Sequence, residues 1–370
     1  MKNRIRLLQV INSAARGGGT QHLKYLVRAL DPSRFEVHIC ISPDGPCLDE
    51  FRGDGYPVHP IDMMASRWQS RAARELSALI REVGPELVHL HGTRAAFFVT
   101  RSAGEKRNSR MIYTVHGLSY NKKIGFLKEF FYRRIEKSIC ARVDAVISVS
   151  ETDGREMVQN GIVGPEKLVV IPNGVDLKRF LSLPLGRTSP TPAGVIARLT
   201  EQKGIPHFLD ALALLKNEFG LLLDAVIVGD GPLKESLQSQ AARLQIGAQI
   251  EWAGSVDDPL PFYRRFGIFV LPSLWEGFPL VLLEAMASGV PVVATDTSGG
   301  SDIVAHRANG LLVRRGDPRS LALAVKELHE DRVLAQTLAR SGREETAQKY
   351  SLEKFVSATE KVYDRLLKGM

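Results

Sequence analysis

The chain has 370 residues, which is too long for one ordinary domain and suits two domains of ~150–200 residues. Hydrophobic residues make up 44% and charged residues 24%, a balance that excludes wholesale disorder. The formal net charge is +8, and the excess is local, because segment 94–142 holds 12 basic and 3 acidic residues. A local basic region favours an anionic partner such as phosphate, nucleic acid or a membrane surface.

Cysteine usage and the apolar runs indicate the compartment. Cys40, Cys47 and Cys140 form no C-x-x-C pair, which disfavours a disulfide scaffold or a thiolate metal site and favours a reducing cytoplasm. The apolar run 5–11 is interrupted by Arg6 and Gln9 and is too short for a signal peptide, and no stretch approaches ~18 apolar residues. We therefore expect a cytoplasmic protein whose contact with a membrane is at most peripheral.

Short apolar strands alternate with helical segments along the whole chain. In the first half, strands are predicted at 5–11, 35–41, 86–91, 110–115, 144–149 and 167–171, with helices at 20–30, 66–83 and 151–160. The alternation restarts after residue 193, with strands at 194–198, 222–228, 267–271, 291–295 and 310–313, and helices at 204–217, 233–245, 279–288 and 318–340. Continuous apolar strands separated by helices predict parallel sheets covered on both faces.

A proline-rich segment divides the two halves. Segment 181–193, LSLPLGRTSPTPA, reads as a linker, and 351–367 has the apolar spacing of an amphipathic helix. We predict a first domain over 1–180, a second over 194–350 and a terminal helical segment over 351–370. Two doubly wound α/β domains offer a ligand site at the carboxyl ends of their strands and a cleft between them.

The most informative stretch is 270–304, in which a strand is followed by a loop and a helix. The loop carries Glu276 and Gly277, and the helix that starts near Pro279 carries Glu284. The first turn of a helix is a good seat for a phosphate, so carboxylates beside it would serve sugar hydroxyls instead. The alternative interpretation is a solvated loop glutamate and a surface helix glutamate.

Cations and glycines follow other predicted strands. Arg198 and Lys203 stand just past a strand end, where two cations can neutralise a leaving diphosphate, although they can also be ordinary surface residues. The turns at 16–20 (RGGGT) and 228–232 (VGDGP) allow close approach of the backbone to a phosphate. The turn at 16–20 is neither G-x-G-x-x-G nor a P-loop, which disfavours a dinucleotide cofactor or a P-loop nucleotidase. The turn at 228–232 can also be one of the common tight turns between a strand and a helix.

Histidines end two strands of the first half. His116 follows a strand in YTVHGL, and His89 and His91 end another in VHLHG; each can line a site or belong to the core. A His89/His91 metal pair lacks nearby Cys or carboxylate partners, and no D-x-D occurs in the chain. We therefore expect no metal site.

Taken together, these motifs resemble the family 4 retaining glycosyltransferases, which have the GT-B architecture. The resemblance spans nearly the whole chain and rests on motifs in a fixed order: Gly18-Gly19, TVHG at 114–117, IPNGVD at 171–176, ARLTEQKG at 197–204, VGDGP at 228–232, and Glu276-x₇-Glu284.

The resemblance implies a role for each matching residue. Arg198 and Lys203 would hold the donor diphosphate, and Glu284 would bind the ribose. Glu276, with the backbone of Gly277 and Phe278, would hold the transferred sugar. Catalytic and donor contacts of the first domain would come from His116 and from Gly18 and Gly19.

The resemblance also implies the reaction. A hexose-type sugar would move from a nucleotide sugar to a glycan or lipid-linked acceptor in bacterial cell-surface polysaccharide or glycolipid synthesis, without a cofactor or a required metal. A uridine diphosphate sugar (UDP-sugar) is favoured over a GDP-sugar, and the terminal helix is expected to return to the first domain. Two motifs depart from the family: Ser298–Asp302 replaces a frequent Gly-Gly-x-Pro-Glu, and Gln21 stands where Glu is frequent.

The basic segment 120–142 has apolar residues at helical spacing, among them Leu127, Phe131, Ile135 and Ile139. A basic amphipathic helix favours an anionic membrane or a lipid diphosphate acceptor, and the alternative is a helix whose apolar side packs on its own domain. The cations of this predicted membrane or acceptor patch are Lys122, Lys123, Lys128, Arg133, Arg134 and Lys137. Nucleic acid is disfavoured, because no recognition module is visible.

Two other function classes stay open. A non-hydrolysing sugar-nucleotide epimerase would need paired acid and base carboxylates in the first domain, and no convincing pair is present. A non-catalytic nucleotide-sugar-binding protein would be expected to lack part of Arg198, Lys203 and Glu284, and all three are present.

Overall fold

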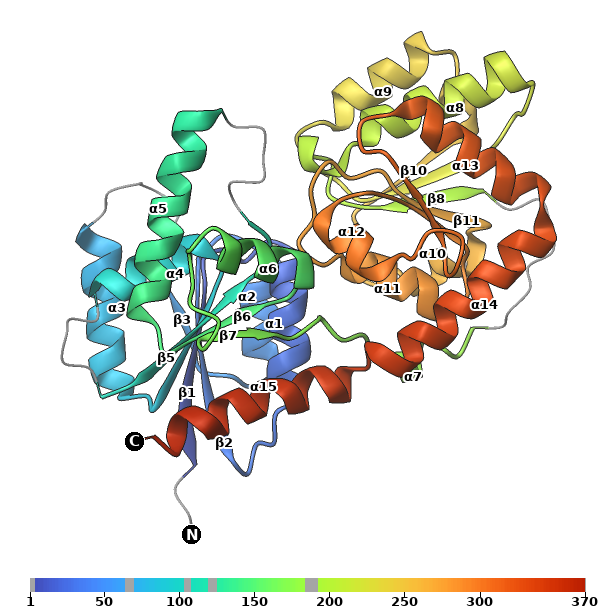
Figure 1. Cartoon of the computed structure of the whole chain (residues 1–370). Helices are drawn as coiled ribbons and strands as arrows, with labels where there is room; N and C mark the ends of the chain where they lie inside the picture. The colour runs from blue at the N-terminus through green and yellow to red at the C-terminus, as the bar shows by residue number, and fades with distance from the viewer. Residues whose placement is uncertain (1–3, 64–69, 103–107, 119–124, 184–191, 370) are drawn as a thin grey trace. The chain divides into compact units, whose positions relative to one another are not determined.

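A computed structural model describes residues 4–63, 70–102, 108–118, 125–183 and 192–369. The chain divides into two compact units (Figure 1): Met1–Gly174 with Leu352–Met370, and Val175–Ser351. The predicted first domain extended to residue 180, whereas the second unit already begins at Val175. The physical reason is Phe180, which is 1% exposed and packs its ring 5.8 Å from that of Tyr263 in the second unit. Most of the predicted linker lies outside the described residues.

The first unit is built on a seven-stranded parallel sheet of order β3-β2-β1-β4-β5-β6-β7. Its strands are Ile5–Ile11 (β1), Phe35–Ile41 (β2), Val58–Pro60 (β3), Leu87–His91 (β4), Arg110–Val115 (β5), Ala145–Ser148 (β6) and Leu168–Val170 (β7). Its helices are Gly18–Ala29 (α1), Pro46–Gly53 (α2), Ser70–Val83 (α3), Thr93–Ser102 (α4), Phe126–Arg142 (α5), Glu151–Gln159 (α6) and Leu352–Leu367 (α15).

Helices cover both faces of this sheet, because successive strand residues point to opposite sides. Leu8 belongs to a buried cluster with residues of α3 and α4, whereas Leu7 belongs to a second cluster with residues of α1, α2 and α15. The terminal helix α15 therefore completes the core of the first unit, and Tyr363 on it is fully buried.

The second unit is built on a six-stranded parallel sheet of order β10-β9-β8-β11-β12-β13. Its strands are Ala193–Ile196 (β8), Ala225–Val228 (β9), Ile250–Gly254 (β10), Ile268–Leu271 (β11), Val292–Thr295 (β12) and Leu311–Val313 (β13). Its helices are Leu177–Phe180 (α7), Ile205–Phe219 (α8), Lys234–Arg243 (α9), Leu260–Arg265 (α10), Leu280–Ala287 (α11), Ser298–Ile303 (α12), Pro318–Glu330 (α13) and Arg332–Lys349 (α14), with 3-10 turns at Glu201–Lys203 (η1) and Gly247–Gln249 (η2).

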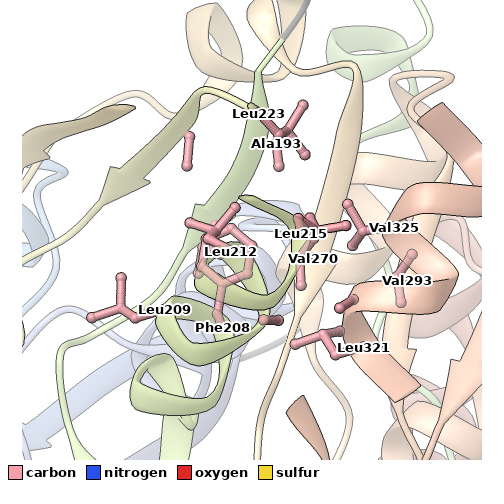
Figure 2. Close-up of a cluster of buried hydrophobic side chains, with 14 of the residues drawn as sticks. Ala193, Phe208, Leu209, Leu212, Leu215, Leu223, Val270, Val293, Leu321 and Val325 are labelled. Atoms are coloured by element: carbon pink, nitrogen blue, oxygen red, sulfur yellow. The ribbon is translucent and has the colours of Figure 1, made fainter. Parts of the chain in front are cut away.

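An apolar core joins this sheet to α8 and α13. Phe208 and Leu212 of α8 and Leu321 and Val325 of α13 pack with strand residues such as Val270 (Figure 2). The expectation of two doubly wound, Rossmann-like α/β domains is thus confirmed.

One long predicted helix is in fact two. The segment 318–340 was expected to be continuous, but α13 ends at Glu330 and α14 begins at Arg332. Asp331 causes the break, because its carboxylate accepts a hydrogen bond from the Leu334 N–H at 2.9 Å and so caps the second helix. The short edge strands β3 and β10 were not predicted.

Strand order fixes where a ligand site is expected in each unit. β1 lies between β2 and β4, and β8 lies between β9 and β11. The crossover connections therefore leave in opposite directions from these neighbouring strands, which opens a crevice at their carboxyl ends. The loops after β8 and β11, and those after β1 and β4, occupy these positions.

Within the parts of the chain that the structure describes, no helix is both long enough and apolar enough to span a membrane.

Candidate functional site

The loop after β11 and the turn η1 after β8 join in the second unit through an ion pair. The Nζ of Lys203 lies 2.5 Å from Oε1 of Glu276, and the Ser273 hydroxyl donates a hydrogen bond to the same oxygen at 2.6 Å. The lysine side chain is 20% exposed and the glutamate side chain 7%. Lys203 and Glu276 are therefore not the solvated surface residues of the alternative interpretation.

Backbone contacts fix this pairing. The Leu274 N–H donates to the Gln202 carbonyl at 2.8 Å, and the Gln202 side-chain amide donates to the Trp275 carbonyl at 3.0 Å. Gly204, at φ +61°, ends η1 so close to the loop that an added Cβ would lie 2.1 Å from the Pro272 carbonyl oxygen. A glycine is required there, which explains why the motif ends in Lys-Gly.

Glu284 lies on α11 and is only 5% exposed. The Tyr263 hydroxyl contacts its Oε2 at 2.9 Å and the Val281 carbonyl at 3.1 Å. A buried carboxylate held by a phenol has a fixed direction, which suits recognition of hydroxyl groups.

The N-terminus of α11 lies between these two carboxylates in sequence. Pro279 occupies the cap position and offers the first N–H groups of this helix no side-chain hydrogen bond. Uncapped N–H groups at a helix start attract an anion.

The short helix α12 packs against the loop that carries Gly277. The Gly299 N–H points to the Glu276 carbonyl at 3.4 Å, and a Cβ added at Gly299 would lie 2.2 Å from the Gly277 carbonyl oxygen. Phe278 is buried, with its ring 5.5 Å from that of Tyr350. Ser298–Asp302, the segment that departs from the family motif, thus keeps its backbone close to the loop that carries Gly277.

Arg198 follows β8 and is exposed. The VGDGP turn supports the backbone beside it, because the Leu199 N–H donates to the Asp230 carbonyl at 2.9 Å. Gly229, at φ +133°, approaches so closely that an added Cβ would lie 1.9 Å from the Ala197 carbonyl oxygen. Arg198 is thus an exposed residue on a loop whose backbone is held in place.

In the first unit, the structure brings the predicted glycine loop to the predicted histidine. Gly18 and Gly19 open α1, and an added Cβ at Gly19 would lie 3.8 Å from Cδ2 of His116. Nε2 of His116 lies 3.2 Å from Nδ1 of His91, and its ring packs edge-on against His22 at 4.6 Å.

Matches to two family models show which family this chain belongs to. The chain matches the family model for glycosyl transferases group 1 over residues 188–345 and the model for glycosyltransferase family 4 over residues 16–179. The chain belongs to the family 4 glycosyltransferases.

Curated relatives span almost the whole glycosyltransferase. The capsular polysaccharide biosynthesis glycosyltransferase CapM of Staphylococcus aureus is 24% identical, over 92% of this chain and 93% of its own. The UDP-Gal:alpha-D-GlcNAc-diphosphoundecaprenol alpha-1,3-galactosyltransferase of Escherichia coli is 26% identical over 90% of each chain. Among solved structures, HepE of Anabaena in complex with UDP-glucose has a TM-score of 0.84 at 20% identity, covering 98% of this chain and 100% of its own.

A buried polar network supports His116 in the glycosyltransferase. The His91 Nε2–H donates to Gln9 at 2.7 Å, Gln9 in turn contacts the Tyr363 hydroxyl at 3.2 Å, and that hydroxyl contacts His89 Nδ1 at 2.6 Å. Burial lowers the pKa of His89, His91 and His116 well below the usual value, so all three are neutral at neutral pH. Both residues of the VHLHG motif therefore lie inside the unit.

Helix α5 carries the predicted basic patch but does not bury one continuous apolar side. Ile139 is buried, whereas Leu127 is 80% and Phe131 60% exposed. Lys128, Arg134 and Lys137 are exposed, Arg133 pairs with Glu129 at 2.7 Å, and Lys122 and Lys123 lie outside the described residues. The purely packed alternative thus holds only for the C-terminal half of α5.

Sequence reasoning missed the residues that hold the predicted ones. Ser273 and Tyr263 orient the two carboxylates, and His22, Gln9 and Tyr363 surround the first-unit histidines. Ser273 stands three residues before Glu276 in the same loop, a local signal that was available. The others have no local signal, because they come from distant elements.

Proposed function

We propose that this glycosyltransferase moves a hexose-type sugar from a UDP-sugar to a glycan or lipid-linked acceptor in cell-surface polysaccharide or glycolipid synthesis. The transfer retains the anomeric configuration and requires no metal. The observation that carries the proposal is the Lys203–Glu276 ion pair, formed by loops that leave the carboxyl ends of neighbouring strands β8 and β11.

Positive charge for the leaving diphosphate comes from three sources in the second unit. Lys203 is oriented by Glu276, Arg198 is exposed on an anchored loop, and the uncapped start of α11 offers N–H groups. Breaking the anomeric C–O bond leaves negative charge on the diphosphate, and preorganised cations stabilise that charge without a metal. An ammonium has three donors, so Lys203 can serve a phosphate while it still contacts Glu276.

The two carboxylates recognise hydroxyl groups in this proposal. Glu284, held by Tyr263, binds the ribose, and Glu276, with the backbone of Gly277 and Phe278, binds the transferred sugar. A carboxylate beside phosphates is repulsive unless a cation compensates it, and Lys203 is that cation. His116 and the Gly18-Gly19 loop are proposed as donor contacts from the first unit.

Retention follows from a front-face route in this proposal. The Glu276 carboxylate already contacts Lys203 and Ser273. A carboxylate engaged in this way is better suited to accept hydrogen bonds from sugar hydroxyls than to act as a covalent nucleophile. The acceptor would then enter on the face from which the diphosphate leaves, as the ring gains oxocarbenium character. Proton NMR of the product from an α-linked donor should give an α linkage, and a β linkage would contradict this route.

The names of two relatives support the donor and acceptor classes. The Escherichia coli relative is named for UDP-galactose and a diphosphate-linked lipid, and HepE was solved with UDP-glucose. We propose the same classes for this chain, with a GDP-sugar as the next candidate.

A peripheral membrane contact through α5 accompanies this proposal. Leu127, Phe130 and Phe131 are exposed apolar side chains, and Lys128 and Arg134 lie among them on the same helix. Exposed apolar side chains next to cations suit binding to an anionic lipid surface. A lipid-linked acceptor would come from such a surface.

Thermal shift with UDP and GDP, each in EDTA, tests the donor proposal. A ligand that binds only the folded state raises the melting temperature, so UDP should raise it more than GDP. Stabilisation by GDP alone would overturn the base preference. No shift with either nucleotide or with any sugar nucleotide would contradict the proposed function.

A further inference from the structure

Three histidines from separate elements of the first unit converge at one point. His22 lies on α1, His91 ends β4 and His116 follows β5. One ring nitrogen from each lies within 4.8 Å of the other two. Nδ1 of His91 and Nε2 of His116 are 3.2 Å apart, close to the ~3.3 Å between two ligands of a tetrahedral ion with ~2.05 Å bonds.

One nitrogen in each of two of these rings is already engaged with an amide oxygen. The Nδ1–H of His22 donates to Oδ1 of Asn173 at 2.7 Å, and the Nε2–H of His91 donates to Oε1 of Gln9 at 2.7 Å. A neutral imidazole carries one proton, so the remaining nitrogens, Nε2 of His22 and Nδ1 of His91, have lone pairs. Metal-binding histidines are oriented in this way, by an acceptor on the nitrogen remote from the metal.

Among the residues that the structure describes, Nε2 of His22 has no hydrogen-bond partner. His22 is 2% exposed, and its Nε2 is a buried atom to which no described residue offers a donor or acceptor. A buried polar atom without a partner is costly and rare in native proteins. A ligand that accepts this lone pair explains why a histidine is present here instead of an apolar side chain.

The chemistry of the three side chains selects the ligand class. Imidazole nitrogen suits zinc and the later divalent transition metals, whereas magnesium and calcium prefer oxygen. Burial lowers the pKa of His22 to about 4, and those of His91 and His116 well below their usual value, so all three are in the neutral form that binds metal.

We propose that His22, His91 and His116 form a binding site for one divalent transition-metal ion of the zinc class. Without the ion, the Nε2–H of His116 donates to Nδ1 of His91. On binding, that proton leaves Nε2 and His116 takes one from solvent at Nδ1, so each imidazole stays neutral. His116 is partly exposed, which leaves a side from which the ion and a completing water can enter.

A consequence rests on the proposed function. If His116 contacts the donor sugar, a bound zinc ion occupies its Nε2 and inhibits transfer. The ion would therefore be a reversible inhibitor, while transfer itself needs no metal.

Titration of the EDTA-treated, desalted full chain with Co²⁺ tests the site directly. Co²⁺ held by three imidazoles in a four-coordinate site absorbs visible light much more strongly than aqueous Co²⁺. We expect this band to saturate at one ion per chain and to disappear when Zn²⁺ is added, because zinc displaces cobalt. A spectrum that stays that of aqueous Co²⁺, together with no saturable Zn²⁺ binding by calorimetry, would overturn the proposal.

Variants locate the binding. His22→Ala and His116→Ala should each weaken Zn²⁺ binding by at least about tenfold, and His116→Ala serves if the buried His22 variant does not fold. His59→Ala is the matched control, because His59 belongs to a separate pair in which its Nε2 lies 3.1 Å from Nδ1 of His38. Unchanged binding in both folded cluster variants, or its loss in His59→Ala, would contradict the site.

Inhibition is measured separately, as the ratio of the sugar-transfer rates with and without Zn²⁺ for the wild type and for each variant. The wild type should be inhibited, and His22→Ala should lose the inhibition. Stoichiometric binding without inhibition would leave the metal site standing and contradict the role of His116 in the proposed function.

Discussion

Oε1 of Glu276 receives both the Lys203 ammonium, at 2.5 Å, and the Ser273 hydroxyl, at 2.6 Å. The carboxylate is thus compensated and directed before any donor arrives. Removing one partner of a buried ion pair leaves the other charge uncompensated, so substitution of Lys203 or Glu276 alone should also lower stability.

Lys203→Met tests the cation in that pair. We expect kcat/KM for the sugar donor to fall by roughly 100-fold or more, about 3 kcal/mol of barrier. The reason is the loss of the preorganised Lys203 ammonium that is proposed to stabilise the leaving diphosphate. Lys326→Met, which removes a surface lysine 2.5 Å from Glu330, should leave the rate unchanged.

A double variant separates activity from stability. Lys203→Met with Glu276→Gln removes both charges, so it should melt closer to the wild type than Lys203→Met alone. Activity should remain low in both. A double variant with restored turnover would show that the lysine only stabilises the loop.

Tyr263→Phe tests the orientation of Glu284. The lost hydroxyl contacts the carboxylate at 2.9 Å, and a hydrogen bond to a charged group is worth ~1.5–3 kcal/mol. We expect UDP affinity, measured by calorimetry, to fall about tenfold or more. Tyr56→Phe, which removes a hydroxyl bound to the Val27 carbonyl in the first unit, is the control and should bind UDP normally.

Leu127→Ser with Phe131→Ser tests the exposed end of α5. Both side chains are mostly exposed, so the fold should be retained while binding to anionic vesicles falls about tenfold or more. Binding by the wild type should also weaken with added salt. Leu222→Ser, at a residue 65% exposed in the second unit, is the control. Equal flotation of all three proteins would remove the membrane contact.

Glu136 makes stability depend on pH in the first unit. It is fully buried and accepts hydrogen bonds from Thr93 at 2.6 Å and Tyr113 at 2.9 Å, and burial raises its pKa. The folded state therefore holds this proton to higher pH than the unfolded state, so its contribution is present in acid and is lost as pH rises through the raised pKa.

Glu136→Gln should remove that dependence. Urea melts give the free energy of unfolding of Glu136→Gln minus that of the wild type. This difference should be more positive at pH ~8 than at pH ~4.5. Glu129→Gln, on the same helix but paired with Arg133 near the surface, should show no such change. A wild-type pH slope in Glu136→Gln would contradict the assignment.

The sequence predicted the alternation of the fold because buried parallel strands must be apolar throughout. It also predicted which loops carry Glu276 and Lys203, since both lie within a few residues of a strand end. It could not predict the contacts that orient them. Tyr363 reaches His89 across 274 residues, and His22 reaches Asn173 across 151, so only the folded sheet brings them together. Spacing alone cannot reveal such partners.

Helix capping and packing explain the remaining differences between the predicted and the observed helices. The pattern at 318–340 is helical throughout, but Asp331 caps a new helix instead of continuing the old one. In α5 the apolar spacing continues past the point where the helix leaves the core, so Leu127 and Ile139 share a period but not an environment.

The most direct test is to follow free nucleoside diphosphate while the enzyme is incubated in EDTA with a panel of UDP-, GDP- and other nucleotide sugars. The wild type should release UDP from a UDP-sugar, and Lys203→Met and Arg198→Ala should each release it roughly 100-fold more slowly. No free diphosphate from any donor, conversion of the donor to an epimeric nucleotide sugar, or wild-type turnover in either variant would contradict these expectations.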